Sequence, residues 1–89
     1  MVEAEAEIVN RLGLHARAAA KLVHLASSFE SEVTLISDEQ EVDAKSILGV
    51  LLLAAAQGTT VKIRCLGVDE TAALAALRDL IAGRFGENE

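Results

Sequence analysis

The stretch VEAEAEI, residues 2–8, indicates the fold class of this protein. Its apolar and acidic residues alternate with a period of two, which predicts a strand with one face buried and the other in water. Such a strand needs helices over its apolar face only, because the acidic face stays solvated. The stretch therefore predicts a sheet that is covered on one side.

Three further stretches show the same alternation, and we expect strands at residues 32–35, 42–44 and 60–65. The polar residues 37–40 join the middle two strands as a hairpin. Lys62 and Arg64 lie on the polar face of the last strand. They would match the glutamates of the first strand if the first and fourth strands are neighbours.

Helical periodicity appears between the strands. It predicts helices over residues 16–28, from residue 47 onward, and from residue 70 to near Gly83. Ser46 and Asp69 precede the second and third helices and are suitable N-caps. The element order is β-α-β-β-α-β-α, which predicts an α+β fold, with residues 1–89 forming a single domain.

Composition narrows the classes of function. The chain has 89 residues, a net charge of -6 and only 2% aromatic residues, so we expect an aliphatic core. Nucleic-acid binding needs a basic surface and stacking aromatics, and an anionic membrane surface also needs basic residues. The longest apolar run, residues 47–56, is too short to cross a membrane. A chain of this length favours a surface site or docking module over an enzyme with an enclosed cavity.

Cys65 is the only cysteine, which excludes an intrachain disulfide and argues against a metal cluster. The first residues do not have the basic stretch and apolar run of a signal peptide. We therefore expect a cytoplasmic protein that needs no metal and no organic cofactor.

The first candidate site is GLHAR, residues 13–17, which places His15 just before a helix and Arg17 in its first turn. The first backbone N–H groups of a helix have no partners within the helix, and the helix dipole favours negative charge there. A phosphate on His15 would meet these donors and the Arg17 guanidinium together. The alternative is that His15 is an ordinary surface residue, and the residues alone leave both open.

The second candidate is the stretch ILGVLLL, residues 47–53, which is more apolar than one buried helix face requires. Val50 and Leu53 suit the core, and Ile47 suits it in part. Three leucines have no clear core role: Leu48, Leu51 and Leu52. They either form a partner surface or belong to a helix that is buried on all sides. Ser46 is by default only a cap, although a phosphate at a helix N-terminus is well tolerated.

These two stretches, GLHAR at 13–17 and DAKSILGV at 43–50, resemble the motifs of the HPr family. HPr is the histidine-containing phosphocarrier protein of the phosphoenolpyruvate-dependent sugar phosphotransferase system. The resemblance spans essentially the whole chain. It implies an open-faced β-sandwich, with an antiparallel four-stranded sheet and three helices on one face. One departure is Ala18, where the family usually has proline; alanine restores a backbone N–H in the first helical turn.

The resemblance also implies a role for each motif. His15 corresponds to the histidine that phospho-enzyme I phosphorylates on Nδ1, and Arg17 to the arginine that attends the phosphoryl group. Ser46 corresponds to the serine that HPr kinase/phosphorylase modifies. Partner docking is implied for five residues: Ala16, Ala20, Ile47, Leu48 and Leu51.

We therefore predict a monomeric phosphoryl carrier rather than an enzyme. It would accept a phosphoryl group on His15 from enzyme I and pass it to the IIA domains of sugar permeases. A transcriptional regulator is a further expected partner where Ser46 is phosphorylated. The alternative is an HPr-like regulatory protein that acts through Ser46 and partner binding, without phosphotransfer through His15.

Overall fold

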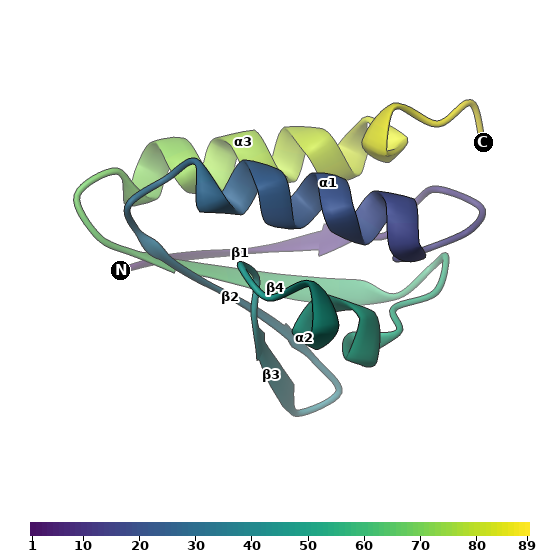
Figure 1. Cartoon of the computed structure of the whole chain (residues 1–89), viewed down its shortest axis with the longest axis horizontal. Helices are drawn as coiled ribbons and strands as arrows, with labels where there is room; N and C mark the ends of the chain where they lie inside the picture. Colours follow the sequence, from purple (N-terminus) through teal and green to yellow (C-terminus); the bar gives the residue numbers. More distant parts are fainter.

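A computed structural model describes all 89 residues and contains one sheet of four antiparallel strands (Figure 1). The strands are β1 (Val2–Glu7), β2 (Glu32–Ser37), β3 (Gln40–Asp43) and β4 (Thr60–Leu66). Their order across the sheet is β1-β4-β2-β3, and each neighbouring pair is antiparallel. The predicted strands and the hairpin between β2 and β3 are confirmed, with β3 beginning two residues earlier than the sequence indicated.

The helices cover one face of this sheet. They are α1 (Ala16–Ser27), α2 (Ile47–Leu53) and α3 (Glu70–Ala82), followed by the short 3-10 turn η1 (Arg84–Gly86). Helices α1 and α3 lie side by side, and the shorter α2 packs beside α1 and β3 (Figure 1). The start of α1 and the end of α3 are at the same end of the molecule. The predicted α+β fold with helices on one face is confirmed.

The outer face of the sheet is charged, as the alternation in β1 predicts. Glu3 lies opposite Arg64 in the β1–β4 register, and Glu5 lies opposite Lys62. Arg64 Nε donates to Glu3 Oε2 at 2.8 Å, and its Nη1 donates to Glu41 Oε1 on β3 at 3.1 Å. The hydrogen bond from Arg64 lowers the pKa of Glu3. Because exposed ion pairs contribute little stability, their main effect is to favour this strand register.

The core lies between the sheet and the helices. The fully buried side chains include Leu35 and Ile63 from the sheet, Leu22 from α1 and Leu77 from α3. The largest of all is Phe85, so the prediction of a purely aliphatic core is wrong at this position. The short turn η1 after α3 buries this ring, and the chain then continues past the residues that precede α1, where the Arg11 amide donates to the carbonyl oxygen of Glu89. Phe85 therefore anchors residues 84–89, which we call the tail, to the core.

The two predicted N-caps behave differently. Ser46 Oγ accepts from the Gly49 amide at 3.1 Å, which confirms the first. Asp69 occupies the N-cap position of α3, as predicted, but its side chain makes no capping hydrogen bond to that helix. Its carboxylate accepts from the amides of Glu30 at 2.9 Å and Ser31 at 3.0 Å, and from the Ser31 hydroxyl. Asp69 thus ties the start of α3 to the turn between α1 and β2.

This arrangement makes part of the folding stability depend on pH. Hydrogen bonds from Ser31 and from the Glu30 amide lower the pKa of Asp69 from its ordinary value of 3.8. A lowered folded-state pKa stabilises the fold above the unfolded value, and this contribution is lost as the pH falls through the folded value. We expect Asp69→Asn to lower the urea midpoint at pH 7, and its difference from the parent to shrink below about pH 3.8.

The matched control is Asp79→Asn, because Asp79 is an exposed acid on the same helix. Urea melts of the parent and both variants over a pH series would test the prediction. A midpoint difference for Asp69→Asn that is constant from pH 7 to pH 2 would contradict it.

Candidate functional site

His15 lies at the N-cap of α1, in the connection between β1 and that helix. Its backbone is extended, with φ -74° and ψ 177°, and its carbonyl accepts from the Ala19 amide at 2.8 Å. The amides of Ala16, Arg17 and Ala18 donate to no acceptor in the protein. The structure therefore places the imidazole beside a helix N-terminus whose first donors are unused.

Gly13 lets this connection lie flat against the segment after α2. Its φ is 66°, and a Cβ there would lie 2.6 Å from the carbonyl oxygen of Ala55. The next residue, Leu14, donates its amide to that same oxygen at 2.9 Å. Only glycine combines this left-handed backbone with such a close approach. The segment that carries His15 is thereby held in one place against the rest of the fold.

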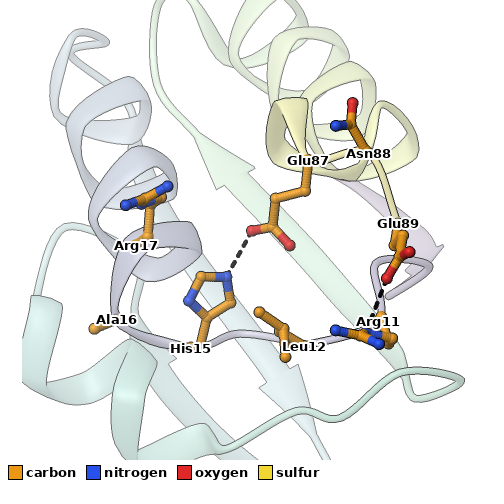
Figure 2. Close-up of a pocket in the computed structure, with 8 residues that line it drawn as sticks. All are labelled: Arg11, Leu12, His15, Ala16, Arg17, Glu87, Asn88 and Glu89. Atoms are coloured by element: carbon orange, nitrogen blue, oxygen red, sulfur yellow. Dashed lines mark hydrogen bonds and ion pairs between the residues drawn. The ribbon is translucent and has the colours of Figure 1, made fainter.

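The tail supplies a side chain that the sequence analysis did not identify as part of the site. Glu87 points at the imidazole, with its Oε2 2.6 Å from His15 Nε2 (Figure 2). Its other oxygen, Oε1, accepts from Asn10 Nδ2 at 3.1 Å. The hydrogen bonds with His15 and Asn10 lower the pKa of Glu87. The His15 side chain is 29% exposed and that of Glu87 is 17% exposed, so the pair is partly shielded from water.

An open pocket of about 670 Å³ lies beside the ring. Eight residues line it: Arg11, Leu12, His15, Ala16, Arg17, Glu87, Asn88 and Glu89. Arg11 Nε is 3.1 Å from Glu89 Oε2, whereas the Arg17 side chain makes no ion pair or hydrogen bond. A free guanidinium near unused helix amides can hold an anion such as a phosphate. His15 and Arg17 thus line one pocket, as the sequence predicted, and Ala16, which was expected to dock partners, lines it as well.

The second candidate region is an exposed apolar surface on α2. Val50 and Leu53 are buried, at 0% and 7% exposure. Four other side chains are exposed, and we call them the α2 patch: Ile47 at 43%, Leu48 at 64%, Leu51 at 37% and Leu52 at 68%. The idea that α2 is buried on all sides is therefore wrong, and the partner-surface hypothesis remains.

Three further apolar residues are exposed on α1 and on the loop that precedes it. Ala16 and Ala20 are exposed on α1, which packs beside α2. Leu12 is 61% exposed and lines the His15 pocket. The sequence analysis missed Leu12, because an isolated leucine in a loop has no periodic pattern that would reveal its exposure.

Ser46 is the N-cap of α2, as the sequence predicted, and it directly precedes Ile47 of the α2 patch. The Ser46 hydroxyl oxygen accepts from the Gly49 amide in the first turn of α2. The preceding residue, Lys45, donates Nζ to the carbonyl oxygen of Phe29 at 2.8 Å. Ser46 is half-buried and belongs to a different element from His15. Ser46 does not line the His15 pocket.

The structure contains no group of three or more histidine, cysteine, aspartate or glutamate side chains that could hold a metal ion. None of its helices combines the length and the apolar character that crossing a membrane requires.

Comparisons with known proteins agree with this geometry. The family model described as the PTS HPr component phosphorylation site matches residues 2–83. The phosphocarrier protein HPr of Xylella fastidiosa strain Temecula1 is 52% identical over 88 residues, which cover 99% of each chain. HPr of Cupriavidus necator is 52% identical over the full length of both chains. A crystal structure of HPr from Thermoanaerobacter tengcongensis has a TM-score of 0.97 and 46% identity, and both chains are covered completely.

Fold, site and relatives together define a small carrier protein rather than an enzyme. The chain belongs to the HPr family of phosphocarrier proteins of the phosphotransferase system. Its phosphotransfer role follows from that family.

The exposure of the α2 patch leads to a stability prediction that compares two leucines of one helix. Leu48→Ala is expected to change the free energy of unfolding by less than about 0.5 kcal/mol, because an exposed leucine leaves no cavity. Leu53→Ala is expected to cost about 2–5 kcal/mol, because it truncates a buried side chain. Urea unfolding of both variants measures the difference. Equal losses in the two variants would contradict the exposed-patch description.

Proposed function

We propose that His15 is the phosphoacceptor of this carrier, with phospho-enzyme I as donor and the IIA domains of sugar permeases as acceptors, in the cytoplasm. The observation that carries this proposal is the setting of the ring. The imidazole is accessible, it lies at the helix N-terminus with three unused backbone amides, and it lines the same pocket as Arg17, whose guanidinium is unpaired. No other histidine has such surroundings, since His24 lies on the exposed side of the last turn of α1.

Phosphoryl transfer to His15 requires a positioned ring nitrogen and groups that stabilise the negative charge of the phosphoryl oxygens. A lone pair on the His15 ring attacks phosphorus, a new N–P bond forms, and the bond from phosphorus to the donor breaks with its electrons leaving on the donor. Negative charge spreads over the three remaining phosphoryl oxygens during the transfer. The free amides of α1 and Arg17 stabilise this charge, and hydrogen bonds to charged groups are worth about 1.5–3 kcal/mol each. Transfer to a IIA domain is the same step in reverse.

Ala18 fits this mechanism although the HPr family usually has proline there. Its side chain is fully buried, and its amide is one of the three that have no acceptor. A proline would lack that N–H group. In this chain the first turn of α1 therefore offers one more donor toward the site.

We further propose that the α2 patch, with Ala16 and Ala20 of α1, docks enzyme I and the IIA domains. Four exposed apolar side chains on one short helix form the kind of surface that usually marks a partner site. Because this surface adjoins α1, a partner bound there would face the helix that begins at His15. One surface would then serve donor and acceptor in turn.

Ser46 is proposed as a regulatory site for HPr kinase/phosphorylase, with a transcriptional regulator as a further partner of the phosphorylated form. Its hydroxyl already points at the N-terminus of α2, where a phosphate would be electrostatically favoured. The added charge would also stand next to the apolar α2 patch. Phosphorylation is therefore expected to change association rather than folding.

The test of the main proposal is incubation with enzyme I and phosphoenolpyruvate, followed by mass spectrometry under non-acidic conditions. The parent is expected to gain one phosphoryl group that acid removes, and His15→Ala to gain none. His24→Ala is the matched control, because it removes the other histidine of α1 and should be phosphorylated like the parent. A phosphorylated His15→Ala variant would contradict the assignment, and an unphosphorylated parent would favour a regulatory protein that acts without His15.

The test for Ser46 uses Ser46→Asp, which adds a single negative charge at the N-cap of α2. Aspartate also caps helices, so the melting temperature is expected to stay the same or rise slightly. Binding to enzyme I is expected to weaken several-fold, because an apolar surface gains an unpaired charge. Titration calorimetry and thermal melts check the two parts, with Ser46→Asn as the uncharged cap control. Equal binding by the two variants would show that charge at this position is irrelevant to docking.

A further inference from the structure

The tail contact determines which nitrogen of His15 carries the proton. A neutral imidazole has one N–H, on Nδ1 or on Nε2, and the hydrogen bonds of the ring decide between them. Here Nε2 faces Glu87 Oε2 at 2.6 Å, and Nδ1 has no partner in the protein. An ionised carboxylate only accepts hydrogen bonds, so the short contact requires the proton on Nε2. The lone pair is then on Nδ1.

We propose that Glu87 is a positioning residue for phosphoryl transfer, which holds the proton on His15 Nε2 and so makes Nδ1 the nucleophile. This inference rests on the proposed function of His15. In the transfer step the Nδ1 lone pair forms the N–P bond, and the donor leaves with the electrons of the bond that breaks. The Nε2 proton stays on the ring throughout. The ring becomes cationic when Nδ1 binds phosphorus, and the Glu87 carboxylate balances that charge at 2.6 Å.

Glu87 can do this because its own orientation is set by a buried donor. Asn10 is fully buried, and its Nδ2 donates both to the Gly13 carbonyl oxygen at 2.8 Å and to Glu87 Oε1 at 3.1 Å. Since Asn10 presents an N–H group to Glu87, the side chain at position 87 must offer it an oxygen. One carboxylate oxygen thus serves Asn10, and the other is left for His15.

The backbone of the tail is held on both sides of Glu87. Phe85 is fully buried, and its carbonyl oxygen accepts from Lys21 Nζ of α1 at 2.6 Å. Beyond Glu87, the Arg11 amide donates to the carbonyl oxygen of Glu89 at 2.8 Å. The carboxylate is therefore positioned by the fold before any partner binds, as a group that aligns a nucleophile must be.

This arrangement predicts an unusual order among variants at position 87. In Glu87→Gln, the amide oxygen must still accept from Asn10, so the amide nitrogen faces His15. An N–H group that faces Nε2 requires a lone pair there and drives the proton to Nδ1, which blocks the nucleophile. Glu87→Ala removes the carboxylate that favours the proton on Nε2, but it adds no donor that would favour the proton on Nδ1. The isosteric glutamine should therefore be the more damaging change.

The experiment measures tautomer and transfer rate on the full chain. Two-bond proton–nitrogen NMR correlation of protein labelled with 15N-histidine reads the tautomer of neutral His15, and quenched-flow transfer from phospho-enzyme I gives the rate. We expect Nε2–H and the highest rate in the parent, mixed tautomers and a several-fold lower rate in Glu87→Ala, and Nδ1–H with a rate lower by roughly tenfold in Glu87→Gln. Glu5→Gln is the matched control and should behave like the parent, because Glu5 is an exposed glutamate on the outer face of the sheet and does not line the His15 pocket.

The outcomes separate this inference from the proposed function. If Glu87→Gln keeps the parent tautomer and rate, Glu87 does not position the ring, and the inference is wrong while His15 remains the acceptor. If the parent itself accepts no phosphoryl group, the proposed function fails. Circular dichroism melts of each variant identify any loss of rate that comes from unfolding, and an Ala variant slower than the Gln variant at equal stability would also overturn the inference.

Discussion

Burial of a single sheet face beneath α1 and α3 is the constraint on which the rest of this molecule depends. Strand β1 can place its alanines inward and its glutamates in water only if all helices lie on one side. Two helices that lie side by side in this layer present their ends at the rim of the sheet. At one end the layer therefore exposes both the start of α1, with His15, and the end of α3, from which the tail continues.

The candidate site forms because the start of α1 and the end of α3 lie at the same end of the helix layer. The unused amides belong to the first turn of α1, and the carboxylate belongs to the tail beyond α3. Phe85 joins them, because its ring is buried in the core and its carbonyl oxygen accepts from Lys21 of α1, which holds the tail beside that helix. A residue 72 positions away in the chain can thus contact His15 without any long loop. Rigidity at the site comes from the core and does not require a deep active-site cavity.

The protein also leaves favourable interactions unused. Three helix amides, the Arg17 side chain and the α2 patch all lack partners within the fold. Sequences usually satisfy such groups, and those that remain unsatisfied tend to mark functional sites. In an HPr-family carrier, a phosphoryl group and a docked partner are what would satisfy them. On the outer face of the sheet, by contrast, Glu3 and Glu41 both pair with Arg64 within the fold.

Local patterns explain why so much could be read from the sequence. Period-two alternation identified β1 and β4 and even their charge pairing. The surplus of leucines on α2 showed that this helix is more apolar than one buried face requires, and the structure then decided that the surplus is exposed. His15 before a helix, Arg17 in its first turn and Ser46 as a cap depend only on neighbouring residues. In each case the physical cause, either side-chain periodicity or a hydrogen bond within one turn, acts over a few positions of the chain.

The remaining features depend on contacts between distant segments, and no local pattern reports those. Asp69 resembles a cap, yet its carboxylate serves amides 38 and 39 positions earlier, since the packing of α3 brings them closer than those of its own helix. Phe85 and Glu87 lie in a short tail without periodicity, so neither burial nor contact with His15 could be anticipated. The sequence by itself determined the elements, their buried faces and the motif at the helix start. Only the tertiary structure decided which carboxylate faces the imidazole, because that depends on where the ends of two packed helices meet.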